Sequence, residues 1–152
     1  MSTLILNVTP LTQELNNCCW HTSAMMIWQY WQEKSGNQGP MNTLGPVYTE
    51  DNGLSANAFI TLGKTAGLKA APLRHTWYGS NLKGILRDRG PIWCAGYWKG
   101  GPHVIVLTGI DGNTVYFNDP QDGMKKTGTV HWFNTNLNNG VKGCMMYKNQ
   151  AA

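Results

Sequence analysis

The spacing of apolar residues changes once along the chain, at the Gly90-Pro91 pair, and this change limits the possible folds more than any other feature. Before it, apolar side chains recur every three or four residues, which is the period of an amphipathic helix. After it, short runs of β-branched and aromatic residues alternate with Gly, Asp and Asn, which is typical of strands joined by tight turns. The sequence therefore predicts an α+β fold in which N-terminal helices pack on a mostly antiparallel β-sheet.

The same pattern places the individual elements. We expect helices at 19–34, 55–67 and 81–88, an extended segment at 68–74, and strands at 92–98, 103–110, 114–118, 128–133 and 143–147. An Asp-Gly-Asn sequence at 111–113 separates two of these strands and is a strong signal for a hairpin turn. The stretch 36–52 is rich in Gly, Pro and Asn, so we expect a long surface loop there.

The composition excludes several classes of protein. A length of 152 residues without repeats or low-complexity linkers indicates a single domain over 1–152, which we expect to be a monomer. Charged residues make up 13% of the chain, and the net charge of +4 comes from scattered cations whose tightest cluster is Lys125-Lys126. Such a surface does not suit nucleic acid. Because no apolar run reaches the roughly 18–20 residues of a bilayer span, we expect a soluble protein with no membrane span.

The four cysteines are placed awkwardly for disulfides, because Cys18 and Cys19 are adjacent. We therefore expect reduced thiols in a cytosol-like compartment. Cys94 and Cys144 each fall within a predicted strand and are expected in the core. Cys19 opens a predicted helix, where unpaired backbone amides and the helix dipole stabilise a thiolate. Cys19 is thus a candidate nucleophile, whereas Cys18 is expected to be a packing residue.

A thiolate nucleophile also needs a base and a group that orients the base. His103 begins one strand of the predicted hairpin, and Asp119 ends the other. Their numbers average to 111, inside the turn, so we expect the two side chains to be cross-strand neighbours. Gln13 lies six residues before Cys19, where its side-chain amide and the Cys19 backbone N–H would stabilise an oxyanion together.

Together these residues resemble the papain-like cysteine peptidases. Gln13 stands six residues before Cys19-Trp20 and a helix, His103 heads a Val-Ile-Val strand, and Asp119 follows sixteen residues later, before a proline. The pattern is most similar to a compact bacterial branch, namely the peptidase domains of double-glycine bacteriocin exporters and papain-like effector toxins of the type VI secretion type. The resemblance covers about residues 10–147.

The resemblance implies a papain-like fold and a thiol hydrolase that needs no cofactor or metal. In it Cys19 is the nucleophile, His103 the general base and acid, Asp119 the orienting residue and Gln13 the oxyanion donor. The implied reaction cleaves a protein or peptide through a thioester acyl-enzyme, at or after small residues such as Gly-Gly. The implied setting is an interbacterial toxin that acts in the reducing cytosol of a target cell, with a cognate immunity or inhibitor protein as partner.

Other hypotheses remain open at this point. The same Cys-His-Asp set serves a peptidoglycan amidase or a protein deamidase, since these reactions also pass through a thioester. A papain-like domain can also act only as a binding module. A zinc site is disfavoured because its ligand types lack the separated pairs of a tetrahedral site: Cys18, Cys19, His21 and His103. Three tryptophans are expected either to line a narrow substrate groove or to lie in the core: Trp20, Trp77 and Trp98.

Overall fold

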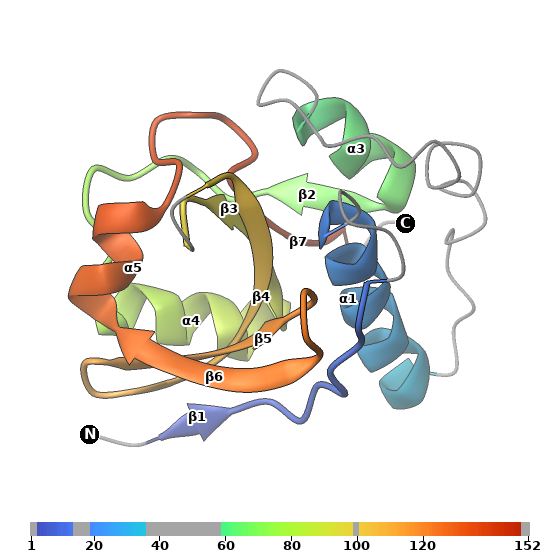
Figure 1. Ribbon diagram of the computed structural model, residues 1–152, viewed down its shortest axis with the longest axis horizontal. Helices are drawn as coiled ribbons and strands as arrows, with labels where there is room; N and C mark the ends of the chain where they lie inside the picture. Colours follow the sequence, from blue (N-terminus) through green and yellow to red (C-terminus); the bar gives the residue numbers. More distant parts are fainter. Residues whose placement is uncertain (1–2, 14–18, 36–58, 99–100, 150–152) are drawn as a thin grey trace.

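The computed structural model describes residues 3–13, 19–35, 59–98 and 101–149 (Figure 1). These residues form an α+β fold on a seven-stranded antiparallel sheet, which confirms the predicted fold class. The strands are β1 Leu4–Ile5, β2 Leu68–Ala70, β3 Ile92–Gly96, β4 His103–Asp111, β5 Thr114–Asp119, β6 Met124–Thr129 and β7 Met145–Lys148. The helices are α1 Cys19–Ser35, α3 Phe59–Ala66, α4 Gly79–Arg89 and α5 Val130–Asn136. The sheet order is β2-β7-β3-β4-β5-β6, and β1 pairs with β4.

The predicted helices and most of the predicted strands are present. α1, α4, β3, β4 and β5 each match an expected segment to within two residues at either end. α3 and β2 occupy part of the expected 55–67 and 68–74, whereas the predicted loop at 36–52 lies outside the described residues. β1 has no counterpart among the predicted strands, because two residues carry too little pattern. In the described part of the chain, no helix is long and apolar enough to cross a bilayer.

The prediction of a strand over 128–133 is wrong. β6 begins earlier and ends at Thr129, whose side-chain oxygen accepts a hydrogen bond from the Trp132 backbone N–H at 2.9 Å. This N-cap starts α5, although a run of β-branched and aromatic residues is typical of a strand. In the helix, the ring of Trp132 stacks on Phe117 and that of Phe133 stacks on Trp98. Packing of these rings therefore outweighs the local preference for a strand.

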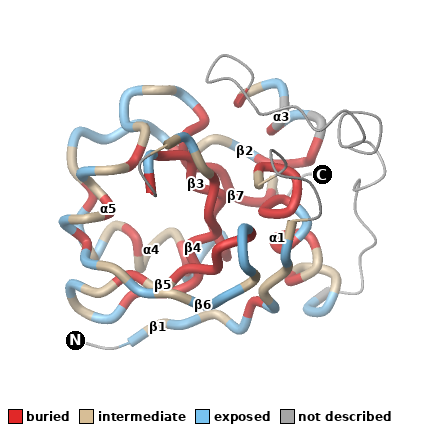
Figure 2. Tube along the Cα trace, viewed as in Figure 1, coloured by how far each residue is buried: buried red, intermediate tan, exposed pale blue. Residues whose placement is uncertain are grey.

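The centre of the sheet is buried along β3, β4 and β7, as Figure 2 shows, and α1 contacts all three strands. Two hydrogen bonds join the first turns of α1 to the sheet. Trp93 Nε1 in β3 donates to the Trp20 carbonyl at 3.0 Å, and the Ser23 hydroxyl donates to the Val104 carbonyl in β4 at 3.4 Å. The start of α1 is therefore held beside the start of β4.

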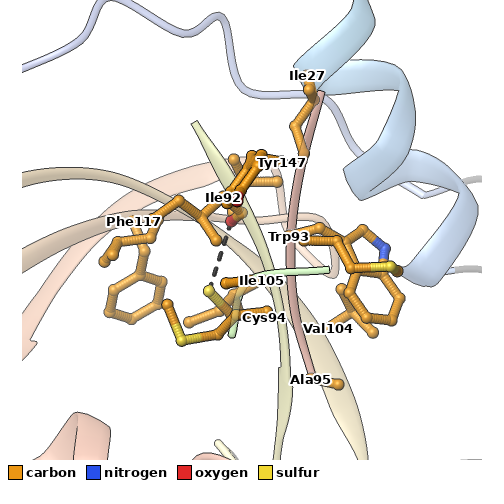
Figure 3. Packing of buried hydrophobic residues seen from close by; sticks show 14 of the residues in the cluster. Ile27, Ile92, Trp93, Cys94, Ala95, Val104, Ile105, Phe117 and Tyr147 are labelled. Carbon is orange, nitrogen blue, oxygen red and sulfur yellow. Dashed lines mark hydrogen bonds between the residues drawn. The ribbon is translucent and has the colours of Figure 1, made fainter. Parts of the chain in front are cut away.

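The core contains two of the cysteines. Cys94 lies beside Ile105 in the apolar core, on the side of β3 opposite to the Trp93 ring (Figure 3), and its thiol donates to the Ile92 carbonyl at 3.5 Å. Cys144 is also buried. The prediction that these two cysteines are core residues is confirmed.

The three tryptophans considered for a substrate groove are core residues as well. Trp20, Trp77 and Trp98 are only 1%, 3% and 7% exposed. The indole of Trp98 donates to the Cys94 carbonyl at 3.2 Å, and its ring stacks on Phe133. These burials favour the core alternative for all three, and Trp77 also lines a surface pocket together with Arg74 and Asn81.

β4 and β5 form the predicted hairpin, but its register changes along its length. Asp111 pairs with Thr114 beside the turn, whereas Val106 pairs with Asn118 further along. The offset comes from Thr108, which stands in β4 as an extra residue without a partner in the register of β5. Such a β-bulge shifts all later pairs by one residue.

Candidate active site

Cys19 is the first residue of α1 and is half-buried. Backbone amides in the first turn of a helix have no acceptor within the helix, so they favour negative charge on the sulfur. Ser23 lies one turn later, and its hydrogen bond to the carbonyl of Val104 draws this end of α1 towards the first residue of β4. That residue is His103, so the helix and the strand bring the thiol and the imidazole together.

His103 and Asp119 are in direct contact. His103 Nε2 lies 2.7 Å from Asp119 Oδ1, and the two side chains are 10% and 0% exposed. The Cys19 side chain also interacts with the His103 imidazole, and this interaction raises the pKa of His103. Because Nε2 is engaged by the carboxylate, Nδ1 is the ring nitrogen that serves Cys19. The structure thus brings together the Cys, the His and the Asp that the sequence predicts.

Opposing effects set the pKa of His103. Burial is the largest of them and lowers the pKa, because it disfavours the charged imidazolium. Hydrogen bonds with Asp119 and Cys19, together with the charges of both groups, act in the other direction and outweigh burial. The pKa of His103 is raised from 6.5 to about 9. At neutral pH the imidazole is therefore protonated.

The bulge in β4 places the side chain of Asp119 on the same face of the sheet as that of His103. Continuing the Val106–Asn118 register places Asp119 opposite Ile105, so that His103 is its diagonal neighbour on the same face. If Thr108 were instead paired in a regular register, Asp119 would stand opposite Val106, and its side chain would point to the other face. The predicted direct pairing of His103 with Asp119 is off by two residues, an even number, so the predicted contact is still made.

Asp119 has a further partner that the sequence analysis missed. Lys126 Nζ in β6 lies 2.9 Å from Asp119 Oδ2 and 2.7 Å from Asp122 Oδ2. The backbone N–H of Gln121 donates to Asp119 Oδ1 at 3.0 Å. Lys126 pairs with Phe117 across the β5–β6 hairpin, which puts it on the face of Asp119. The turn signal at Asp122-Gly123 could have revealed this second hairpin, had the strand at 128–133 not been misplaced.

Gln13 lies at the same end of the sheet. Its backbone N–H donates to the carbonyl of Pro120, the residue after Asp119, at 2.7 Å. The turn after β5 also packs closely on the neighbouring residue, because a Cβ on Gly123 would overlap Thr12 Oγ1. Thr12 and Gln13 are therefore held beside the turn that follows Asp119, whereas the role of Gln13 as an oxyanion donor stays a prediction.

Cys94, Cys144 and His21 are placed differently from Cys19 and His103. Burial raises the pKa of the Cys144 thiol to about 11 and that of Cys94 well above its ordinary value. Both thiols are therefore unsuited to nucleophilic attack. His21 is buried with its ring against the edge of Trp20, and Cys18 lies outside the described residues. Across 3–13, 19–35, 59–98 and 101–149, no group of three or more His, Cys, Asp or Glu side chains gathers as a metal-ligand set.

Comparison with known proteins agrees with this geometry. Residues 3–138 match the sequence profile of a family described as papain-like cysteine protease AvrRpt2. Among solved structures, the fold is similar to that of a double-glycine motif protease from an AMS/PCAT transporter, crystallised in complex with the leader peptide. The two chains are 17% identical and superpose with a TM-score of 0.59 over 97% of each. No curated protein matches the sequence.

Proposed function

The chain belongs to the AvrRpt2 family of papain-like cysteine proteases, and from this premise we propose that it is an endopeptidase whose nucleophile is Cys19. One observation carries the proposal: the His103 imidazole contacts Asp119 through Nε2 at 2.7 Å and interacts with the Cys19 side chain at the start of α1. A nucleophile, a base and a group that orients the base are the parts that thiol hydrolysis needs.

In the proposed reaction, the Cys19 thiolate attacks the carbonyl carbon of the scissile peptide bond. The protonated His103 then donates its Nδ1 proton to the departing amine as the C–N bond breaks, which leaves a thioester on Cys19. A water molecule next attacks the thioester, losing its proton to His103, and the acid product leaves as the thiolate re-forms. Asp119 holds the Nε2–H throughout, so that Nδ1 stays directed at the reacting atoms.

The tetrahedral intermediate carries a negative oxygen that needs donors. We propose that these are the backbone N–H of Cys19 and the side-chain amide of Gln13. The bond between the Gln13 backbone and Pro120 supports this role, because it fixes Gln13 next to the residue that orients His103.

We also propose that the substrate is a protein cut at or after small residues such as Gly-Gly. The structural neighbour is a double-glycine motif protease bound to a leader peptide, which supports the idea by analogy of fold. The near-complete burial of His103 and Asp119 supports it on steric grounds, because a backbone without side chains can approach the sulfur more closely. Two exposed apolar residues at this end of the sheet, Tyr97 after β3 and Met124 at the start of β6, are suited to contact the substrate beyond the cut.

The setting we propose is a bacterial effector toxin that acts as a monomer in a reducing compartment and is restrained by an immunity or inhibitor protein. The thiols of Cys19, Cys94 and Cys144 form no disulfide with one another, which supports a reducing environment.

The decisive experiment compares bacterial cells that express the wild-type protein with cells that express Cys19→Ala, by mapping new protein N-termini. New termini that follow small residues, only in the wild-type cells, are expected. New termini that follow bulky residues would contradict the proposed Gly-Gly specificity but not the proposed peptidase activity. Without new termini, the loss of side-chain amides or the release of peptidoglycan fragments would indicate a deamidase or an amidase.

A further inference from the structure

We propose that Lys126 is a positioning residue, which fixes Asp119 as an ionised carboxylate and limits how strongly Asp119 holds the proton of His103. The inference rests on the roles proposed above for His103 and Asp119. It adds the side chain of Lys126 to the arrangement of Cys19, His103 and Asp119. Lys126 itself does not touch the reacting atoms, since it reaches His103 only through Asp119.

The geometry divides the carboxylate of Asp119 between two cations. Oδ1 faces His103 Nε2 at 2.7 Å, and Oδ2 faces Lys126 Nζ at 2.9 Å. His103 and Lys126 come from the strands on either side of β5. The carboxylate is therefore held from both sides within the sheet, and its plane is fixed by bonds to both oxygens.

Burial makes this second cation necessary. Asp119 is 0% exposed, and an isolated carboxylate removed from water is strongly destabilised. Lys126 supplies a charge-assisted hydrogen bond from its ammonium group, while 30% of its own side chain remains exposed. The lysine can thus keep the carboxylate ionised without being fully desolvated itself.

Several charged groups act on His103 in this site, and they come from different elements. Asp119 on β5 and Cys19 on α1 contact the imidazole directly. Lys126 on β6 acts through Asp119, and Asp122 in the following turn acts on Lys126 at 2.7 Å. The positive charge of Lys126 offsets part of the negative charge of Asp119. Without that offset, the imidazolium would hold its proton more tightly and would release it less readily to the leaving amine.

The test is an NMR titration of the His103 imidazole in the full chain, with the resonance assigned by its loss in His103→Gln. In Lys126→Met, we expect the midpoint of His103 to rise by up to about one unit, the lower end of the shift that a directly contacting charge produces. Lys126→Arg keeps the cation and should titrate as the wild type does. Lys125→Met is the matched control, because Lys125 is exposed and its neighbouring position in β6 directs it to the other face of the sheet.

A midpoint that is unchanged or lowered in folded Lys126→Met would overturn the inference. An equal rise in Lys125→Met would also overturn it, because the effect would then be one of net charge. If Lys126→Met does not fold, Lys126→Gln retains a donor for Asp119 without the charge and should show the same rise. The readout needs no substrate, so it is independent of whether Cys19 proves to be the nucleophile. That question is decided by the Cys19→Ala comparison.

Discussion

His103 Nε2 lies 2.7 Å from Asp119 Oδ1, although the two residues are not register partners in the β4–β5 hairpin. Their contact is diagonal, and it depends on the bulge that takes Thr108 out of the register between His103 and the turn. Since the strand positions of both residues are set by the backbone, the imidazole is oriented before any substrate binds. Such preorganisation is what allows a hydrogen-bonded base to act without rearrangement.

Cys19→Ala should reduce peptide cleavage by at least about a thousandfold, because no other described thiol lies beside His103. Cys18→Ala should keep most of the activity. The measurement is the rate of cleavage of a mixed peptide library, together with peptide mapping after treatment with iodoacetamide. Selective alkylation of Cys19, with Cys94 and Cys144 unmodified, is expected from their burial. Full activity in Cys19→Ala would reject the assignment of the nucleophile.

The raised pKa of His103 predicts how stability changes with pH. The folded protein binds this proton more tightly than the unfolded chain, with a pKa of about 9 against 6.5. The stabilisation is complete below pH 6.5 and is lost as pH rises through about 9. It amounts to an upper bound on the order of 3 kcal/mol in the free energy of unfolding.

Urea unfolding at intervals from pH 6 to about 10 measures this effect. The wild type should lose more stability over the range than His103→Gln does. His131→Gln, at an exposed position in α5, controls for substituting a histidine. Parallel curves for the wild type and His103→Gln would show that the proton of His103 is not coupled to folding.

Gln13→Ala should lower kcat by about a hundredfold, the cost of removing one donor to an oxyanion. KM should change little, because the donor acts on the transition state more than on the bound substrate. Gln121→Ala is a suitable control, since Gln121 is exposed and bonds to Asp119 through its backbone N–H. A rise in KM with unchanged kcat would instead place Gln13 in substrate binding.

Gly123→Ala should impair activity by displacing the segment that carries Gln13. Gly123 has a φ of 68°, and an added Cβ would overlap Thr12 Oγ1. Gly140→Ala is the matched control, because Gly140 has a φ of 92° but open space around its Cα. Both variants should lose about 1 kcal/mol of stability from the backbone conformation.

Only Gly123→Ala should also lose activity, measured on the same peptide library. Thr12→Gly in that background should restore part of the activity, since it removes the overlapping hydroxyl. Equal activity in the two alanine variants would show that contact between the turn and Thr12 does not position the site.

The sequence predicts the parts of this site that depend on short-range pattern. The helical period locates Cys19 at the start of a helix, and the Asp-Gly turn brings the strands of His103 and Asp119 together. The bulge at Thr108 could not be predicted, because Thr is also a favoured residue in a regular strand. The charge partner Lys126 is hidden for a related reason: the β-branched and aromatic run of α5 predicts a strand, which obscures the β5–β6 hairpin and its register.

The bulge at Thr108 also gives a criterion for judging relatives of this protein. A homologue can retain the cysteine, the histidine and the aspartate and still be inactive, if it keeps the same number of residues between the last two but pairs them in a regular register without the bulge. The number of residues in that interval is therefore informative only together with the presence or absence of a bulge. Inactive members of such a family would be found from the pairing of these two strands, with every catalytic residue still in place.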